Sequence, residues 1–413
     1  MEKKPTIVLF GTFDTKMQPL LLLRELMVSH TPSPAVMLMD VGRTPVARAD
    51  IPHVGGASSS STALDRNAVV TELAGHMAEH LRRLHAAGAI HGAISLGGSC
   101  GTTLAATAMQ RAALPIGFPK VIVSTMAGGD VSPYVGDSDI VLMPSIVDIA
   151  GSNALLSRIL ANAAAAITGM AFAAAAAAAA PSPSAKKAVA ITMFGITTPA
   201  VTEAQRVLER HGLEVYVFHA TGAGGRTMEQ LAAAGHFDGV LDLTTTELAD
   251  ELFGGVLSAG PDRLTAATRC GLPQVVSVGA TDCINFGPLD TLPAGLHAAG
   301  SGGRTIVVHN PSVTLVRTDR DECRVLGGHL AQKLRPAGAR AAVVLPTQGV
   351  SALSAEGGVF CDPEADAALR DELKCGLDGS GVVVVEEDMA INDAGFGEKM
   401  ATRLVCMMET QPV

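Results

Sequence analysis

Tryptophan is absent from this chain and other aromatic residues are scarce. Aromatic residues make up 3% of the 413 residues, and the net charge is −10, with 30 Lys and Arg against 40 Asp and Glu. Single strands of nucleic acid bind to stacked aromatic rings and duplexes bind to basic surfaces, and this chain is poor in both. We therefore expect no nucleic-acid partner.

Charged residues and paired cysteines are also few. Charged residues are 17% and hydrophobic residues 48% of the chain, a balance that excludes an intrinsically disordered protein. The seven cysteines include no C-x-x-C pair. Such scattered cysteines are unlike a disulfide framework and are typical of a reducing compartment.

No segment has the pattern of a signal peptide or a membrane span. The apolar run near the N-terminus is short and ends at Gly11-Thr12. The one long uncharged stretch, residues 161–180, is mostly alanine, which is too weakly apolar to drive insertion and predicts a buried or linking helix. We expect a cytoplasmic protein with no membrane partner.

Apolar runs of strand length alternate with helical patterns along the chain. The clearest helix is expected over residues 63–87, where apolar residues recur at i, i+3 and i+4. This alternation implies parallel βαβ units in a doubly wound sheet. In the first half, strands are expected at residues 6–10, 35–40, 92–96, 120–124 and 140–143.

The pattern of strands and helices restarts after a run of alanines. Residues 173–180 are eight consecutive alanines, and the Pro-Ser-Pro-Ser that follows ends any helix. We predict an α/β protein of two tandem Rossmann-like, doubly wound domains, with mainly parallel sheets and an interdomain cleft. The N-terminal domain is residues 1–180, the linker 181–187 and the C-terminal domain 188–413.

The second half repeats motifs of the first. Residues 188–212 repeat the order of residues 6–26: an apolar strand, Phe-Gly, threonine and a helix. Residues 305–315 (TIVVHNPSVTL) resemble residues 139–149 (DIVLMPSIVDI), which suggests that the two segments are counterparts.

Residues 90–107 are the most informative stretch. An apolar strand leads into Gly-Gly-Ser-Cys-Gly, and two threonines then open an alanine-rich helix. Glycines let the backbone approach a ligand, and the N–H groups at a helix start favour an anion. We predict a phosphate or carboxylate site; the alternative is a turn whose threonines only cap the helix. The predicted contacts are Gly97, Gly98, Ser99, Gly101, Thr102 and Thr103.

Polar residues follow two further strands of the first domain. Loops at the carboxyl ends of parallel strands line the ligand crevice of doubly wound sheets. Asp14 is expected to hold Mg²⁺ or a ribose hydroxyl and Lys16 a phosphate; the alternative is that Asp14 or Thr15 caps the next helix. In the acidic turn 136–139, Asp137 is the second candidate for Mg²⁺, with Asp139 beside it; the alternative is that these residues cap a strand. The predicted contacts at these ends are Thr12, Asp14, Thr15, Lys16, Ser124, Gly128 and Gly129.

Two motifs are expected to be structural. His76-Met77-Ala78-Glu79-His80 matches the H-x-x-E-H zinc-peptidase string, but it has no obvious third ligand and predicts a solvated helix face. Cys100 lies where a helix N-terminus would activate a thiol, and we expect it to be a small loop residue.

The motifs together resemble a known family. They are GTFDTK (11–16), LGGSCGT (96–102), STMAGGD (124–130), GDSD (136–139), HNPSVTLVRT (309–318) and IND (391–393). Over essentially its whole length, the chain resembles the ATP-binding domain family of the tomato mosaic virus resistance protein, whose bacterial members are uncharacterised. The resemblance implies a two-lobed α/β fold that binds ATP in the first lobe, and it supplies no established reaction.

The expected function is nucleotide binding with an unassigned reaction. We expect ATP as the cofactor, held at the cleft by the Gly97–Thr103 loop, with Mg²⁺ at Asp14 and Asp137 if a metal accompanies it and a small metabolite as the candidate substrate. The alternatives are an ATP-sensing protein that docks a partner, or an enzyme acting on a carboxylated or phosphorylated sugar. The apolar helix faces predict a homodimer or a higher homo-oligomer.

Overall fold

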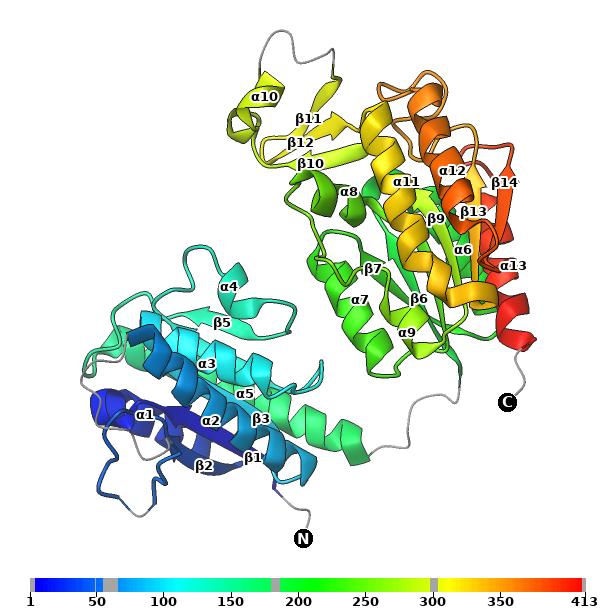
Figure 1. Ribbon diagram of the computed structural model, residues 1–413. Coiled ribbons are helices and arrows are strands. Elements are labelled where there is room, and N and C mark those ends of the chain that lie inside the picture. The colour runs from blue at the N-terminus through cyan, green and yellow to red at the C-terminus, as the bar shows by residue number, and fades with distance from the viewer. Residues whose placement is uncertain (1–3, 49, 55–65, 180–185, 298–303, 411–413) are drawn as a thin grey trace. The chain divides into compact units, whose positions relative to one another are not determined.

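The structure is a computed structural model that describes residues 4–48, 50–54, 66–179, 186–297 and 304–410. The chain divides into two compact units, Met1–Pro183 and Ser184–Val413, each with its own central sheet (Figure 1). Most of the predicted linker, residues 181–187, lies outside the described residues. The predicted cleft concerns the placement of the two units and stays a prediction.

Unit 1 is built on a sheet of five parallel strands in the order β2-β1-β3-β4-β5. Apolar runs form the three inner strands, β1, β3 and β4, which are buried on both faces, as is usual in parallel sheets. The direction of the strand order changes between β1 and β3, which makes this pair the switch point of the sheet. The strands are β1 (Thr6–Gly11), β2 (Ala35–Asp40), β3 (Gly92–Gly97), β4 (Lys120–Ser124) and β5 (Val141–Pro144).

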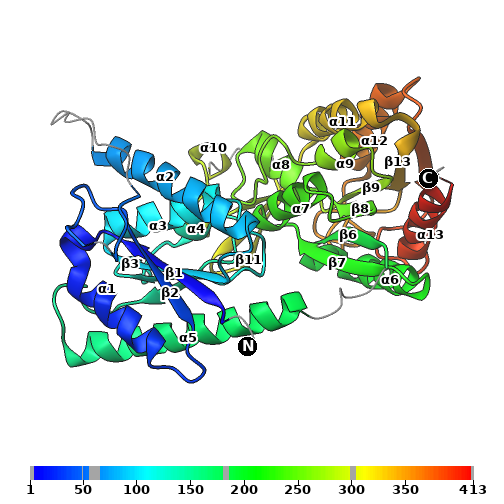
Figure 2. The same ribbon diagram turned by 90° about the horizontal axis from the view of Figure 1, so that it is seen from below.

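Helices cover both faces of this sheet (Figure 2). Because side chains alternate along a strand, Val8 and Phe10 of β1 pack toward α2 and α3, whereas Ile7 and Leu9 pack toward α1 and α5. The helices are α1 (Phe13–Val28), α2 (Arg66–Ala86), α3 (Ser99–Arg111), α4 (Ser132–Val135) and α5 (Ala154–Ala179).

Helix α5 contains the alanine-rich stretch. Among the described residues it is the one helix that is long and apolar enough to cross a bilayer by length and composition, a test that the core helix of a soluble protein also passes. Leu156, Leu160 and Ile167 are fully buried against the sheet of unit 1. This side of α5 therefore belongs to the core of the unit.

Unit 2 has a six-stranded parallel sheet in the order β14-β13-β9-β8-β6-β7. Read from β7 to β13, this order repeats that of unit 1, and β14 extends it by one strand. The predicted fold class, two tandem doubly wound α/β domains with mainly parallel sheets, is confirmed. The strands are β6 (Ala188–Met193), β7 (Glu214–His219), β8 (Gly239–Thr244), β9 (Gln274–Gly279), β13 (Ala341–Pro346) and β14 (Val383–Glu387).

Two helices of unit 2 cover one face of its sheet. Helices α6 and α13 pack on Ile191 and Leu241, while α7, α9, α11 and α12 pack on the opposite face. The helices are α6 (Thr198–Arg210), α7 (Ala223–Ala233), α8 (Thr246–Phe253), α9 (Ala266–Cys270), α10 (Ala294–His297), α11 (Arg320–Leu334), α12 (Pro363–Leu377) and α13 (Phe396–Glu409).

A small antiparallel sheet is inserted between β9 and β13. It contains β10 (Cys283–Phe286), β11 (Ile306–Asn310) and β12 (Val313–Arg317) in the order β10-β12-β11. The interpretation of residues 305–315 as the counterpart of residues 139–149 is wrong, because β13 takes the sheet position that corresponds to β5. The turn explains the difference: the Ser312 N–H donates to Asn310 Oδ1 at 2.8 Å and folds β12 back on β11.

Candidate functional site

A cavity of about 440 Å³ lies at the switch point of unit 1. Its lining comes from Thr12 and the first turn of α1, the segment after β2, helix α2, the end of β3 and the start of α3. In doubly wound sheets, ligands bind outside the carboxyl ends of the strands where the strand order changes direction. The cavity is therefore the candidate ligand site, and we call it the unit 1 pocket.

Eight of the predicted contacts line the unit 1 pocket. They are Thr12, Asp14, Thr15, Lys16, Gly97, Gly98, Ser99 and Gly101. The structure thus brings together two strand-to-helix segments that are more than 80 residues apart in sequence. Six other predicted residues are not among the lining residues: Thr102, Thr103, Ser124, Gly128, Gly129 and Asp137.

Helix α3 begins at Ser99, three residues before the predicted start at Thr102. Gly98 is the N-cap, and the first bond within the helix runs from the Thr102 N–H to the Gly98 carbonyl at 2.8 Å. The N–H groups of Ser99, Cys100 and Gly101 precede that bond and point out of the helix start. An anion in the pocket would meet these amides and the positive end of the helix dipole.

The two adjacent glycines have different roles. A Cβ at Gly97 would come 2.8 Å from the Gly101 Cα, so Gly97 is needed for β3 to pack against the first turn of α3. A Cβ at Gly98 would meet nothing closer than Thr125 Oγ1 at 3.8 Å, and the Gly98 φ of −80° suits any residue. Gly98 therefore leaves the pocket floor open without any need for a left-handed backbone.

The threonines of α3 are structural. Thr102 is completely buried, and its Oγ1 lies 2.6 Å from Ser124 Oγ and 3.3 Å from the Gly97 carbonyl oxygen. The Thr103 hydroxyl donates to the Ser99 carbonyl at 3.0 Å. The Thr102 hydroxyl therefore ties α3 to β3 and β4, whereas the Thr103 hydroxyl bonds within the first turns of α3. Neither threonine opens the helix, which corrects their predicted placement.

Lys16 and Asp14 line the pocket, but the protein uses both side chains internally. Lys16 Nζ donates to the Ile149 carbonyl at 2.5 Å. Asp14 Oδ2 accepts the N–H groups of Arg43 and Thr44 at 3.1 and 3.2 Å, and so it caps a loop rather than its own helix. Lys16 was predicted to bind phosphate and Asp14 to bind Mg²⁺, but in this structure both side chains bond to the protein backbone.

The sequence interpretation missed Arg43. Its side chain is exposed and lines the unit 1 pocket, and its guanidinium has no hydrogen-bond or ion-pair partner among the described residues. Arg43 follows β2, the strand beside β1, so the rule about strand ends already pointed to this segment.

One wall of the pocket is apolar. Val69, Val70 and Leu73 of α2 face the cavity together with Leu104 of α3 and Val41. The rest of the lining is mostly polar and includes Arg43 and the first residues of α3. The pocket therefore suits a ligand that has an anionic group at one end and a flat or apolar group at the other, which would pack on the apolar wall.

Asp40, at the end of β2, shapes the rim of the pocket. Its completely buried carboxylate accepts the N–H groups of Phe13 and Gly42 at 3.1 and 2.8 Å, and it lies 3.1 Å from His53 Nδ1. These contacts fix the segment after β2 against the start of α1. The position of Asp40 at a strand end could have marked it as a site residue from the sequence. In the structure it supports the loop after β2 and does not line the cavity.

The other candidates of unit 1 lie outside the pocket. His80 Nδ1 donates to the His76 carbonyl at 3.0 Å, and His76 lies 3.9 Å from Glu72 on the flank of α2. No group of three His, Cys, Asp or Glu that could hold a metal is found in the described part of the chain. Asp137 lies just after α4 and is not among the residues that line the pocket with Asp14. Cys100 is exposed in the pocket lining.

The corresponding edge of unit 2 is filled by the protein's own side chains. Thr197 Oγ1 and Thr244 Oγ1, which follow β6 and end β8, lie 2.8 Å apart. The Glu247 carboxylate accepts the N–H groups of Gly222 and Gly225 at 2.7 and 3.1 Å, at the start of α7. A carboxylate of the chain thus occupies the helix N-terminus where an external anion would bind.

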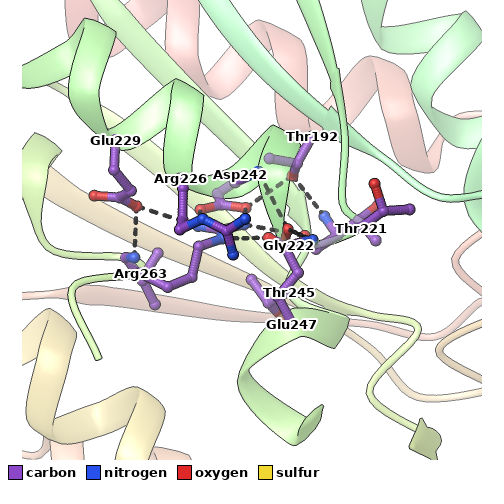
Figure 3. Close-up of polar contacts among 12 residues, drawn as sticks. Thr192, Thr221, Gly222, Arg226, Glu229, Asp242, Thr245, Glu247 and Arg263 are labelled. Atoms are coloured by element: carbon purple, nitrogen blue, oxygen red, sulfur yellow. Dashed lines mark hydrogen bonds and ion pairs between the residues drawn. The ribbon is translucent and has the colours of Figure 1, made fainter. Parts of the chain in front are cut away.

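A buried arginine completes this cluster in unit 2 (Figure 3). Arg263 is completely buried; its Nη2 donates to Asp242 Oδ1 at 2.7 Å and its Nε to Glu247 Oε2 at 2.6 Å. Glu229 Oε1 lies 3.4 Å from Arg263 Nη1. Burial raises the pKa of Glu247, although Arg263 opposes the shift. The cluster ties α7 and α8 to the sheet.

Two further polar side chains of unit 2, Asp282 and Asn392, hold its loops in place. Asp282 is buried and accepts the Ser351 hydroxyl at 2.6 Å, and burial raises the pKa of its carboxyl. Asn392 of the Ile-Asn-Asp motif donates through Nδ2 to the Ile196 carbonyl at 2.8 Å, which fixes the turn after β6.

The fold and the pocket define a doubly wound α/β protein of two related units, with a candidate small-molecule site in the first. Two family descriptions match it: the N-terminal domain of the uncharacterised protein family UPF0261 over residues 5–176, and the C-terminal domain of the same family over residues 186–408. The chain belongs to this family.

Relatives of the chain occur in bacteria and in a plant. A UPF0261 protein of Clostridium tetani is 42% identical over 418 residues, which cover 99% of this chain and 100% of that protein. The ToMV resistance protein Tm-1(GCR237) of Solanum lycopersicum is 43% identical over 311 residues, 75% of this chain and 40% of that protein. The suspected resemblance is therefore confirmed.

Solved structures give only a distant likeness. Acinetobacter baumannii MurG covers 99% of this chain and 100% of its own, with 11% identity and a TM-score of 0.23. UDP-N-acetylglucosamine 2-epimerase of Rickettsia bellii covers 66% of this chain and 79% of its own, with 9% identity and a TM-score of 0.21. Scores this low support no functional argument.

Proposed function

We propose that unit 1 binds a nucleotide, with ATP as the expected ligand, in the unit 1 pocket. The observation that carries this proposal is the amphipathic lining at the switch point between β1 and β3. The phosphates would lie at the start of α3, where the amides of Ser99 to Gly101 favour negative charge. The base would cover the apolar wall of Val69, Val70 and Leu73.

The size of the cavity agrees with this proposal. Small-molecule and cofactor sites usually enclose about 300–1,000 Å³, and the pocket measures about 440 Å³. An apolar wall beside a few convergent polar groups is typical of such sites. A free phosphate or a small carboxylate would leave the apolar wall uncovered.

The proposal is limited to binding and assigns no reaction. No histidine is among the described residues that line the pocket, and Asp14 is the one carboxylate that lines it. Phosphoryl transfer depends on metal ions that bridge the phosphates and on a group that orients the nucleophile. The described lining supplies one carboxylate rather than a pair, and no histidine that could act as a base.

Calorimetric titration of the full chain tests the proposal. ATP, ADP, adenosine and inorganic tripolyphosphate are titrated with and without Mg²⁺, and sugar phosphates and sugar acids are titrated in parallel. We expect ATP and ADP to bind more tightly than either adenosine or tripolyphosphate, because each of the latter fills only one end of the pocket. Binding of the sugar ligands without binding of any nucleotide would overturn the proposal.

A further inference from the structure

We propose that Arg43 is the side chain that binds the anionic group of the pocket's ligand, and that Asp14 is its positioning residue. The inference rests on the proposed function for the identity of the ligand. It reassigns the anion-binding role that was expected of Lys16 and the ligand-binding role that was expected of Asp14, and it follows from the contacts of Lys16, Asp14 and Arg43.

Arg43 is the uncommitted cation of the pocket. Its exposed side chain lines the cavity and has no polar partner within the described residues. An arginine fork can donate two parallel hydrogen bonds to a phosphate or a carboxylate. Its charge would add to the N–H groups at the start of α3, which line the same cavity.

Lys16, the other cation in the lining, is committed elsewhere. Its Nζ donates to the Ile149 carbonyl at 2.5 Å, and its backbone departs from helical geometry, with φ −126° and ψ 27°. This contact ties the first turn of α1 to the segment before α5. An anion that recruited Lys16 would have to break this hydrogen bond, whereas Arg43 loses no protein partner.

Asp14 holds the backbone that carries Arg43. Its Oδ2 accepts the N–H groups of Arg43 and Thr44, and a Cβ at Gly42 would come within 2.5 Å of its Oδ1. The backbone of Gly42 therefore packs directly on the carboxylate. On the other side, the Gly42 N–H donates to Asp40 Oδ1 at 2.8 Å. Two carboxylates thus fix the residue that precedes Arg43.

The two possible roles of Asp14 predict different behaviour of Asp14→Asn. An Asn side-chain oxygen can accept both N–H groups, so a positioning role survives this change and is lost only in Asp14→Ala. A magnesium ligand would instead lose much of its affinity in Asp14→Asn, because Mg²⁺ prefers carboxylate oxygens. The pair of variants therefore separates positioning from metal binding.

The test is calorimetric titration of the full chain with ATP and with inorganic tripolyphosphate. We expect Arg43→Gln to weaken binding of both ligands at least tenfold. Arg48 lies on the same loop and pairs with Asp50 at 2.8 Å, so Arg48→Gln is the matched control and should change affinity less than twofold. Asp14→Ala should weaken binding about tenfold and Asp14→Asn less than threefold, and Asp14→Ala should add little in the Arg43→Gln background.

The outcomes separate this inference from the nucleotide proposal. Tight ATP binding that is unchanged in folded Arg43→Gln would overturn the inference and leave the proposed function standing. Binding of tripolyphosphate that depends on Arg43, with no added affinity for ATP, would support the inference and overturn the nucleotide assignment. If Asp14→Asn loses Mg²⁺-dependent affinity as strongly as Asp14→Ala, the positioning role is wrong. Failure of the wild-type chain to bind either ligand would overturn both proposals.

Discussion

The backbones of Gly97 and Gly101 touch: a Cβ at Gly97 would lie 2.8 Å from the Gly101 Cα. We expect Gly97→Ala to lower the free energy of unfolding of unit 1 by about 1–3 kcal/mol, because neither backbone segment can yield. Gly98→Ala is the neighbouring control and should cost less than about 1 kcal/mol, since the space around Gly98 is open. Urea unfolding measures both; equal effects would contradict the assigned roles.

Gly98→Asp tests the predicted anion site. The nearest atom to the new side chain's Cβ position is 3.8 Å away, so we expect the variant to fold. Its carboxylate would repel an anion at the start of α3, and affinity for ATP should fall at least tenfold, or about 1.4 kcal/mol. Gly98→Asn has nearly the same shape without the charge and should lose less. Unchanged affinity in folded Gly98→Asp would remove this turn from the site.

Thr102→Val should change stability and leave ligand affinity unchanged. The buried hydroxyl of Thr102 lies 2.6 Å from Ser124 Oγ, which itself accepts the Met126 N–H at 2.9 Å. Valine keeps the shape but removes this partner, at a cost of about 1–3 kcal/mol in the free energy of unfolding. Thermal unfolding together with a titration distinguishes the two effects. A loss of affinity without loss of stability would place Thr102 in the ligand site after all.

The strands and the switch-point loops could be predicted because their signals are local. Apolar runs marked β2 and β4 at the bounds that the structure gives, and the glycines after β3 marked a close approach of backbones. The helix start at Ser99 was missed because Thr102 and Thr103 resemble caps. Gly97 has no side chain, so the first turn of α3 packs directly against the end of β3 and the helix begins earlier. Residue preferences suggest several possible N-caps for a helix, and tertiary packing determines at which of these neighbouring residues the helix begins.

Long-range partners could not be predicted from the sequence. Nothing in the sequence around Lys16 shows that its ammonium group donates a hydrogen bond to the Ile149 carbonyl. Nor does it show that the Asp14 carboxylate accepts the Arg43 backbone N–H. The cluster around Arg263 brings together carboxylates from α7, β8 and α8, separated by up to 34 positions from the arginine. Such pairs depend on how helices and strands pack against one another, and this packing cannot be inferred from the local sequence around each residue.

Arg263→Met should destabilise unit 2 severely. Removal of the completely buried guanidinium leaves Asp242 and Glu247 as buried carboxylates without their cation. Breaking a buried ion pair in this way typically costs about 3–5 kcal/mol. Arg269→Gln is the control: its side chain is 58% exposed and pairs with Asp262, so the cost should stay within about 0.5 kcal/mol. Urea unfolding of both variants decides, and equal midpoints would contradict a stabilising role for the cluster.

Asp250 should make the stability of unit 2 depend on pH. Its carboxylate on α8 accepts the N–H groups of Asn285 and Leu257, both at 2.8 Å, and burial raises its pKa from 3.8 to about 7. The folded state therefore holds this proton more tightly than the unfolded chain. The resulting stabilisation is fully present below about pH 4 and is lost as the pH rises through about 7. We expect Asp250→Asn to show a flatter dependence over this range.

The comparison of slopes isolates Asp250 from other acids. Burial also raises the pKa of Asp366, to about 6, but Asp366 is present in both proteins and contributes equally to the two slopes. Asp388→Asn is the control, because hydrogen bonds from Gln348 and Thr347 lower the pKa of Asp388, so its titration lies below the window. Unfolding in urea, followed by circular dichroism at several pH values between 4 and 8, measures the slopes. Equal slopes for wild type and Asp250→Asn would show that the backbone N–H groups of Leu257 and Asn285, together with the Asn285 side-chain amide, hold Asp250 ionised in the folded state despite its burial.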